Sequence, residues 1–493
     1  MTHRALPALL FLSGALFPLA LAPFFYWPLG LVSLAGLVLG LAQARSGKQA
    51  FFYAWLYSTG QFLVGVSWIY VSMQRFGGAP VWLAALAVTL FAAFLALIPA
   101  TVFALRHRLF GQSLAWLTLP VFWFLSEWVR GHLLTGFPWL FAGDAHLSSW
   151  LSGYAPIIGS YGLSFLAVLS VTTLWQVWRS RRYAWLLLLG FWPLGAYLHS
   201  LDWTTPTATL QVSAVQGNIP QSEKWTPEAV SPTIATYYQQ STKHWDSALI
   251  LWPETAVTLL YDQFQPYMAD IGAEARSHGS TIITGIAYRY PRSSPLYGEF
   301  HNSITAFGNG DGLYHKQKLV PFGEFVPLEK QLRGLIPFLD LDMSGFMAGR
   351  ADQDLLKVSH QQQLFLIAPF ICYEIAYSEQ VAHMAKQADL LVTVSNDAWF
   401  GDSLGPKQHM ALAQMRALET GRYVLRATNT GITALVDNKG KIVARLPYEV
   451  RATLTAQAQM RQGSTPYMLL GLWPLWLTSL LILALAYWRK RRI

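Results

Sequence analysis

Three side chains that could perform covalent chemistry together lie far apart in the sequence. Glu254 and Cys372 each come directly after a short apolar run, and Lys316 lies in a segment between them. Cys372 is the chain's one cysteine, so it is either a small buried apolar side chain or a reactive thiol. A strand that turns into a helix at a cysteine exposes the sulfur and places it at a helix N-terminus, which favours thiolate. The set predicts a nucleophilic cysteine site.

The elements that would position these residues alternate along residues 202–466. Short apolar runs rich in β-branched residues predict strands buried on both faces, at 209–215, 248–252, 281–288, 303–307, 364–371, 390–394, 423–427 and 432–436. Helical patterns cover 227–244, 266–278, 378–387 and 406–420, and tight turns are expected at 309–312 and 437–440. The pattern predicts one α/β domain whose helices cover its sheets.

The composition argues against a purely soluble protein. Hydrophobic residues make up 53% and charged residues 12% of the 493 residues, whereas soluble proteins have roughly 25% charged residues. Of the 26 acidic residues, 24 lie between positions 202 and 466. The abundance of Trp, Phe and Leu and the lack of a heptad or short repeat exclude disordered, collagen-like and coiled-coil proteins. A membrane protein with one large water-facing domain remains.

Eight apolar stretches approach the length of about 20 residues that spans a hydrocarbon core of about 30 Å: 5–24, 27–44, 51–73, 80–105, 114–129, 154–178, 183–201 and 467–488. With a cytoplasmic N-terminus, the inside segments hold 12 Lys and Arg and the short outside loops only Arg75 and Arg130. An alternative interpretation makes the first stretch a cleaved signal sequence, with Ala20-Leu21-Ala22 as the processing site.

This topology predicts three parts. Residues 1–201 form a membrane domain of seven transmembrane helices, 202–466 form an extracytoplasmic domain, and 467–493 form a final transmembrane helix with a basic cytoplasmic tail. The extracytoplasmic part has 21 Lys and Arg against 24 acidic residues, so the net charge of +9 comes from the membrane parts and no nucleic-acid partner is expected. Histidine spacing gives no support for a metal site.

Three segments contain the candidate residues: Trp252-Pro253-Glu254, Lys316 with Leu319, and Cys372-Tyr373-Glu374. They resemble the Glu-Lys-Cys triad segments of the nitrilase (carbon-nitrogen hydrolase) superfamily. Further segments, at 216–221 with Trp225, 319–327, 395–400 and 127–139, resemble the bacterial apolipoprotein N-acyltransferase family. This resemblance covers nearly the whole chain. It implies a nitrilase-like αββα sandwich inserted into a polytopic α-helical membrane protein.

The resemblance implies a two-step acyl transfer in the bacterial inner membrane. A phospholipid such as phosphatidylethanolamine donates an acyl chain to Cys372, which gives a thioester. The α-amine of the diacylglyceryl-cysteine that begins an apolipoprotein then takes the acyl chain, as the last step of lipoprotein maturation. The catalytic domain would be periplasmic, both termini cytoplasmic, the protein a monomer, and no metal or other cofactor would be needed.

The residues suit this chemistry. A thiol with a reference pKa near 8.5 needs a base or positive surroundings to attack an ester at neutral pH, so Glu254 is the expected general base. Lys316 is the expected oxyanion stabiliser, together with the backbone N–H of Tyr373. Lys318 is a competing candidate that a strand would turn to the opposite face.

The resemblance also maps Trp225, Glu324, Tyr373 and Glu374 to active-site support. Glu324 is expected to orient Lys316 or Glu254, and Glu374 to hold the incoming amine; ordinary packing near a cleft is the alternative for all four residues. The apolar region 325–346 is expected to be either a lid that dips into the outer leaflet or a packed loop. Glu127 and Arg130 share a helix face and are expected to pair as a structural or headgroup contact.

Two other functions fit the triad residues. A membrane-tethered amidase or nitrilase-like hydrolase would use the same three residues with water as the acceptor. A non-catalytic lipid-binding scaffold would not need a complete triad. The membrane half of the chain favours the acyltransferase over both.

Overall fold

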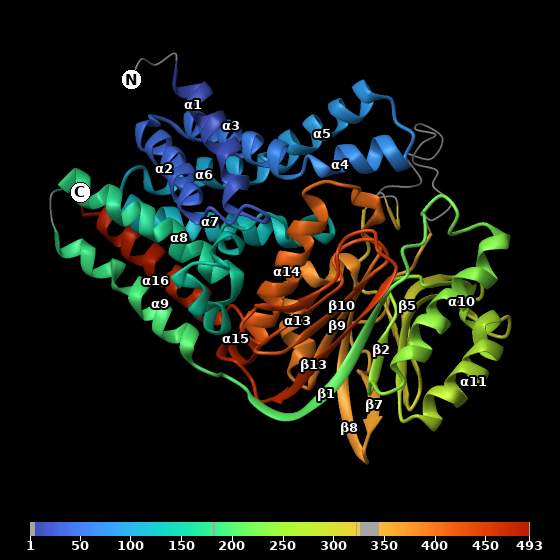
Figure 1. Ribbon diagram of the computed structural model, residues 1–493. Coiled ribbons are helices and arrows are strands. Elements are labelled where there is room, and N and C mark those ends of the chain that lie inside the picture. Colours follow the sequence, from blue (N-terminus) through green and yellow to red (C-terminus); the bar gives the residue numbers. More distant parts are fainter. Residues whose placement is uncertain (1–4, 181–182, 322, 326–344, 493) are drawn as a thin grey trace. The chain divides into compact units, whose positions relative to one another are not determined.

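The computed structural model describes residues 5–180, 183–321, 323–325 and 345–492, and the chain divides into two compact units (Figure 1). The helical unit comprises Met1–Leu201, Asp402–Ala411 and Leu469–Ile493. The α/β unit comprises Asp202–Gly401 and Leu412–Met468. The segment 402–411 thus groups with the helical unit, although the expected domain limits place it in the catalytic domain.

Apolar sequence forms the helices of the helical unit. They are α1 Leu6–Leu16, α2 Trp27–Gln43, α3 Gly47–Gly65, α4 Trp68–Val71, α5 Val81–Leu95, α6 Leu97–Phe110, α7 Ala115–His132, α8 Ala155–Ser180, α9 Phe191–Ser200 and α16 Trp473–Lys490. Shorter helical turns lie at Phe17–Ala20, Ser72–Phe76, Leu133–Thr135, Ala142–His146, Trp150–Tyr154 and Tyr183–Gly190. Proline occupies the first turn of α1, α2 and α16, where its missing N–H costs no hydrogen bond.

Helices α1 and α3 approach each other closely through glycine. A Cβ atom on Gly14 would lie 1.8 Å from the carbonyl oxygen of Tyr57, and one on Gly60 would lie 2.2 Å from that of Phe11. Only a residue without a side chain fits at these two positions. Such small-residue contacts are the usual means of packing helices where surrounding lipid removes the hydrophobic drive.

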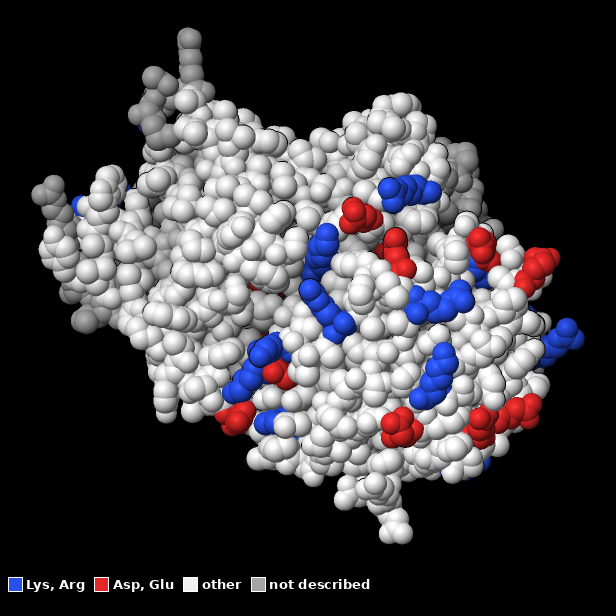
Figure 2. Space-filling view, in the orientation of Figure 1, with Lys and Arg blue, Asp and Glu red and all other residues white. Residues whose placement is uncertain are grey.

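Among the described residues, two helices are long and apolar enough to cross a membrane, Val81–Phe110 and Trp150–Ser180, and Leu6–Ala20 and Trp27–Gln43 are shorter apolar helices. Each of the eight predicted stretches contains helix, but the eight-span topology stays a prediction. Large apolar side chains lie exposed on α5 and α16, including Leu90, Leu477 and Leu481. In the face shown in Figure 2, the helical unit presents a largely uncharged surface, and the charged side chains gather over the α/β unit.

Glu127 and Arg130 on α7 are both buried in the helical unit. Glu127 accepts hydrogen bonds from Trp123 Nε1 at 2.9 Å and from the backbone N–H of Ala142 at 2.7 Å. Arg130 donates to the carbonyl oxygen of Phe137 at 2.8 Å and also to that of Trp139. These contacts fasten the segment after α7 to the helix, and the pairing of Glu127 with Arg130 stays a prediction.

Thirteen strands among the described residues build the α/β unit. They are β1 Thr205–Gln216, β2 Leu249–Leu251, β3 Val257–Leu260, β4 Thr281–Arg289, β5 Phe300–Gly308, β6 Gly310–His315, β7 Leu356–His360, β8 Gln363–Ile371, β9 Leu390–Ser395, β10 Val424–Thr428, β11 Ala434–Val436, β12 Ile442–Arg445 and β13 Ala452–Gln462. They pair in the order β12-β11-β10-β9-β8-β7-β6-β5-β4-β2-β1-β13, and β3 pairs with β4. Two parallel sets, β1-β2-β4 and β8-β9-β10, are joined through antiparallel β5, β6 and β7.

The two halves of this sheet pack face to face, because β1 contacts β10 and β5 contacts β8. Helices cover the outside: α10 Val230–Ser241 and α11 Tyr261–Ser277 lie on the first half, and α13 Ser378–Ala385 lies on β8 of the second (Figure 1). Helix α14 Gly405–Thr420 begins in the helical unit and ends in the α/β unit, and α15 is Pro466–Leu470. Helices therefore cover the outside of one continuous sheet whose two halves pack together, as expected of a nitrilase-like fold.

The eight predicted strands and four predicted helices are present, and the turn predicted at 437–440 connects β11 and β12. Of the turn predicted at 309–312, only Asn309 lies between strands, because the other three residues belong to β6. Strands β3, β6, β7, β12 and β13 were not predicted. Helix α11 begins five residues before the predicted start and holds Pro266 inside it, so this proline does not mark the helix start. The predicted lid at 325–346 lies almost wholly outside the described residues.

Candidate active site

The candidate active site lies in the α/β unit, where three strands end. Glu254 follows β2, Lys316 directly follows β6 and Cys372 directly follows β8. Lys316 Nζ is 3.8 Å from Glu254 Oε1, and the charges of both residues act on the Cys372 thiol. The fold therefore brings together three residues that lie far apart in the sequence, because Glu254 and Cys372 are 118 positions apart.

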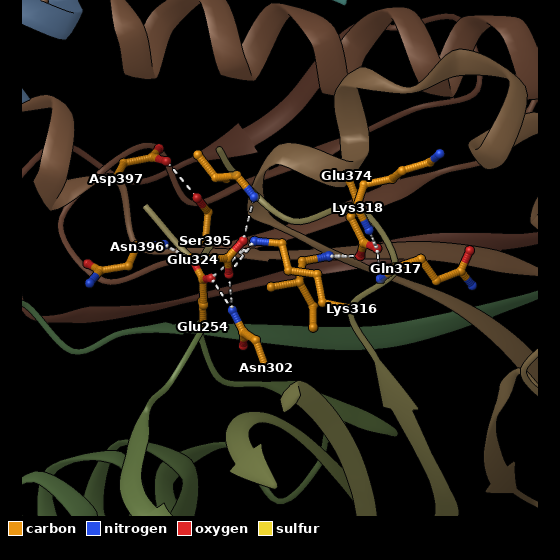
Figure 3. Close-up of polar contacts among 12 residues, drawn as sticks. Glu254, Asn302, Lys316, Gln317, Lys318, Glu324, Glu374, Ser395, Asn396 and Asp397 are labelled. Carbon is orange, nitrogen blue, oxygen red and sulfur yellow. Dashed lines mark hydrogen bonds and ion pairs between the residues drawn. The ribbon is translucent and has the colours of Figure 1, made fainter. Parts of the chain in front are cut away.

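Lys316 is buried and held between two carboxylates. Its Nζ donates to Glu324 Oε1 at 2.8 Å and faces Glu254 Oε1 (Figure 3). Burial alone lowers the pKa of Lys316, but the carboxylates of Glu324 and Glu254 outweigh it and raise the pKa above its ordinary value. Lys316 is therefore a fixed positive charge. It can stabilise a developing oxyanion but cannot serve as a base.

Both carboxylate oxygens of Glu254 have a hydrogen-bond donor. Asn302 Nδ2 donates to Oε1 at 2.8 Å, and the backbone N–H of Asn396 donates to Oε2 at 2.9 Å. Lys224 is also buried, and its Nζ donates to the main-chain oxygen of Glu254 at 3.3 Å. These contacts fix the direction of the carboxylate, and its charge acts on the Cys372 thiol.

Cys372 adopts a left-handed backbone conformation, with φ of +52°. A non-glycine residue in this region is strained, and such strain gathers at functional positions. The turn lies between β8 and a short 3₁₀ helix, Cys372–Ala376, and it leaves the cysteine half-buried. The sharp turn expected from the sequence is present.

The expected stabilisation of thiolate by a helix N-terminus is wrong. The helical turn at Cys372 is one short 3₁₀ segment, and α13 begins only at Ser378. Burial and the negative charge of Glu254 raise the pKa of the Cys372 thiol well above its ordinary value, although Lys316 and a hydrogen bond with Ser395 oppose this. The resting thiol is neutral, so an attack on an ester needs a base to remove its proton.

A second buried ion pair supports the thiol from the β9 side. The Ser395 hydroxyl donates to Asp397 Oδ1 at 2.7 Å, and Arg426 donates to Asp397 Oδ2 at 2.7 Å. The chain Arg426–Asp397–Ser395 therefore orients a hydroxyl that hydrogen-bonds the Cys372 sulfur.

Glu374 does not occupy the position expected for binding an amine. It is fully buried, and its Oε2 accepts from the backbone N–H of Ile371 at 2.8 Å. Its Oε1 accepts from the Tyr314 hydroxyl at 2.9 Å and from the backbone N–H groups of Gln317 at 2.6 Å and Lys318 at 3.2 Å. Glu374 thus ties the cysteine turn to the loop that carries Lys316 (Figure 3).

The remaining candidates differ in their distance from the triad. Glu324 contacts Lys316 as expected for an orienting residue. Tyr373 is buried next to Cys372 and packs edge-on against Tyr377 at 5.4 Å between ring centroids. Lys318 lies over the ring of Tyr377 at 5.3 Å, so it is separated from the carboxylates that hold Lys316. Trp225 lies on the loop after β1 and is 43% exposed, outside the hydrogen-bonded cluster.

Sequence reasoning missed three residues that contact Glu254. Asn302 lies on β5 just before the predicted strand 303–307, and nothing in its neighbourhood distinguished it from an ordinary polar strand residue. Asn396 lies in a segment that carried the family resemblance, and Lys224 directly precedes Trp225, which also carried it. Among the described residues, no group of three or more His, Cys, Asp and Glu is placed to hold a metal ion.

Each of the two units contains a match to a protein-family model. Residues 211–466 match the model described as carbon-nitrogen hydrolase. Residues 13–173 match the model described as apolipoprotein N-acyltransferase N-terminal domain. The first match contains Glu254, Lys316 and Cys372, and the second lies within the helical unit.

Curated relatives match along almost the whole chain. An apolipoprotein N-acyltransferase of Pseudomonas syringae is 44% identical over 95% of this chain and 94% of its own length. One of Azotobacter vinelandii is 44% identical over 97% of this chain and 94% of its own. One of Vibrio vulnificus is 39% identical over 97% and 96%. Matches of this length include both the helical and the α/β unit.

Proposed function

Because the chain belongs to the apolipoprotein N-acyltransferase family, its reaction is the N-acylation of apolipoproteins, and we propose that Glu254, Lys316 and Cys372 perform this reaction. One observation carries the proposal: a buried carboxylate and a buried ammonium lie 3.8 Å apart beside a cysteine on a strained turn. The donor is a phospholipid of the phosphatidylethanolamine kind, and the acceptor is a diacylated apolipoprotein.

In the first step, the sulfur of Cys372 attacks the ester carbonyl of the phospholipid while Glu254 takes the thiol proton. The negative charge that develops on the carbonyl oxygen is stabilised by the Lys316 ammonium and the backbone N–H of Tyr373. When the tetrahedral intermediate collapses, the carbon–oxygen bond to glycerol breaks. Glu254 returns its proton to the leaving oxygen, and a lysophospholipid departs from the acyl-enzyme thioester.

In the second step, the α-amine of the diacylglyceryl-cysteine attacks the thioester carbonyl. Glu254 removes a proton from the attacking nitrogen, and Lys316 again stabilises the oxyanion. Collapse of this intermediate breaks the carbon–sulfur bond and forms an amide. The thiolate takes the proton from Glu254, which regenerates the neutral thiol that the environment of Cys372 favours.

We also propose that the α/β unit faces the periplasm and that both termini lie in the cytoplasm. The distribution of Lys and Arg supports this orientation, because 12 of them fall on the side of the termini and two in the short loops opposite. All three proposed catalytic residues belong to one chain, and we propose that the enzyme is a monomer.

The test is intact mass spectrometry of the purified protein in detergent with phosphatidylethanolamine. We expect wild type to gain one fatty acyl mass and Cys372→Ala to gain none. Addition of a diacylated lipopeptide with a free amine should remove the acyl mass, and the same peptide with an acetylated amine should not. Loss to water at the same rate would instead identify a hydrolase.

The two neighbouring lysines provide a matched control for the oxyanion role. Lys316→Ala should slow formation of the acyl-enzyme by about 100-fold or more, because a preorganised charge on the oxyanion is lost. Lys318→Ala should leave the rate within about twofold, because Lys318 lies over Tyr377 away from Glu254. Equal effects of the two substitutions would contradict the assignment of Lys316.

A further inference from the structure

We propose that Asn302 is a positioning residue that holds the carboxylate of the proposed general base Glu254 in alignment; this inference rests on the proposed function. The side-chain nitrogen of Asn302 donates to Glu254 Oε1 at 2.8 Å and to Glu324 Oε1 at 2.9 Å (Figure 3). One amide group therefore uses both of its N–H bonds on two different carboxylates.

The chemistry of the neighbours fixes the orientation of the amide. Both groups that face the end of the Asn302 side chain are carboxylate oxygens, which only accept hydrogen bonds when ionised. The amide nitrogen must therefore point at them, because the amide oxygen in its place would meet two acceptors. The contact with an ionised carboxylate is the stronger kind of hydrogen bond.

Asn302 also contacts Lys316 through the main chain. The backbone N–H of Lys316 donates to the carbonyl oxygen of Asn302 at 2.8 Å. One residue of β5 thus holds Glu254 from the end of β2, Lys316 from the end of β6, and Glu324 from the loop after it. Asn302 itself is 6% exposed, so water does not take the place of these contacts.

Two carboxylates this close together would repel each other without shared donors. Glu254 Oε1 and Glu324 Oε1 both lie near Lys316 Nζ, at 3.8 and 2.8 Å, and both accept from Asn302 Nδ2. A like charge in the same site favours protonation of one partner, and a hydrogen bond to the charged form opposes it. Asn302 therefore offsets the repulsion between the two carboxylates and holds that of Glu254 in place.

Several charged and titratable groups of the described residues face Glu254. Lys224 reaches it from the loop after β1, Lys316 from the end of β6 and Glu324 from the loop beyond. Cys372 faces it from the end of β8, and Asp397, beyond β9, acts on the same thiol. A substitution of Asn302 leaves all of these groups in place, so a shift in the pH dependence of acyl-enzyme formation would come from the lost amide.

The test is the pH dependence of acyl-enzyme formation with phosphatidylethanolamine, for wild type, Asn302→Leu and Asn302→Asp. Leu has nearly the shape of Asn without its donors, so we expect the acidic limb of the profile to move up by about one pH unit and the rate at pH 7 to fall about 10-fold. Asn302→Asp adds a third carboxylate to the site, and its acidic limb should move further in the same direction.

Asn309→Leu is the matched control. Asn309 connects β5 and β6 of the same hairpin, but its amide donates to the carbonyl oxygen of Ser359 and not to a carboxylate. Its acidic limb should coincide with that of wild type, and thermal unfolding of each variant in detergent establishes that the protein is folded.

The outcomes separate this inference from the proposed function. If wild type forms no acyl-enzyme at any pH, the proposed function fails. If wild type forms it and the limbs of Asn302→Leu and Asn302→Asp stay at the wild-type pH, Asn302 does not control Glu254 and this inference fails, whatever happens to the rate.

Discussion

At the scale of single residues, the site combines a neutral nucleophile with permanently charged neighbours. Burial and the carboxylate of Glu254 raise the pKa of the Cys372 thiol, and the flanking carboxylates raise that of Lys316. Many reactive cysteines instead have a lowered pKa and a standing thiolate. A neutral thiol beside a base resists oxidation better than a standing thiolate, because oxidants react with the thiolate form.

This arrangement predicts opposite effects of one substitution on two reactions of Cys372. Glu254→Gln removes a charge that raises the thiol pKa, so the thiolate fraction at a given pH increases. Alkylation by iodoacetamide at pH 8 should become several-fold faster than in wild type, with the midpoint of its pH profile moved to lower pH. Acyl-enzyme formation should fall by about 100-fold or more, because the proton acceptor is lost.

Glu228→Gln serves as the control for this experiment. Glu228 is an exposed glutamate in the 3₁₀ turn Pro227–Ala229, so its loss changes the net charge by the same amount without touching the site. Both rates should equal those of wild type. If Glu254→Gln slowed alkylation at pH 8, Glu254 would not be raising the pKa of the thiol.

At the scale of secondary structure, the strand ends matter most. Apolar, β-branched runs made β1, β2, β8, β9 and β10 predictable, because strands buried on both faces need such residues. Strand β13 was not predicted because its sequence, ATLTAQAQMRQ, is largely polar. Among the described strands it lies at one end of the order, and it pairs with β1 along its length. Hydrogen bonds to β1 hold this strand in the sheet, and they cannot be predicted from a local sequence pattern.

The same distinction applies to the site. Glu254, Lys316 and Cys372 could be found because each belongs to a motif of consecutive residues. Asn302 could not, because its importance comes from two carboxylates that are 48 and 22 positions away in the sequence. The role of Glu374 was misjudged for a related reason: a carboxylate next to the nucleophile indicates a substrate contact, and only the fold reveals the backbone N–H groups that occupy it.

The turn after β8 gives a prediction about strain. Cys372 has φ of +52°, a conformation that costs an ordinary residue about 1 kcal/mol and costs glycine almost nothing. Cys372→Gly and Cys372→Ala both lack the thiol, so neither should form an acyl-enzyme. Cys372→Gly should nevertheless be more stable than Cys372→Ala by about 1 kcal/mol, seen as a higher unfolding temperature in detergent.

Ala368→Gly, within β8, is the control, because here a glycine should lower the unfolding temperature. Ala368 is fully buried in an extended strand, where glycine loses packing and gains freedom in the unfolded chain, so this variant should unfold at a lower temperature than wild type. If Cys372→Gly were also less stable than Cys372→Ala, the turn would not be strained.

At the scale of the whole molecule, charged and apolar residues are distributed unevenly along the sequence. Nearly all acidic residues belong to the stretch 202–466, and the helical unit leaves apolar side chains such as Leu90, Leu477 and Leu481 exposed. An exposed leucine on a soluble domain needs no explanation when it is single, but a helix that exposes several along its length is suited to hydrocarbon. The proposed lipid donor would reach such a protein without crossing water.

The proposed orientation can be tested with single cysteines, because Cys372→Ala removes the one native cysteine. In that background, Ser277→Cys places a thiol at the exposed end of α11 in the α/β unit, and Lys48→Cys places one at the exposed start of α3 in a predicted cytoplasmic loop. A membrane-impermeant maleimide added to spheroplasts should label Ser277→Cys and leave Lys48→Cys unlabelled until the membrane is permeabilised. The reverse pattern would place the α/β unit in the cytoplasm and contradict the positive-inside assignment, and labelling of both before permeabilisation would place the α2–α3 loop on the same side as the α/β unit.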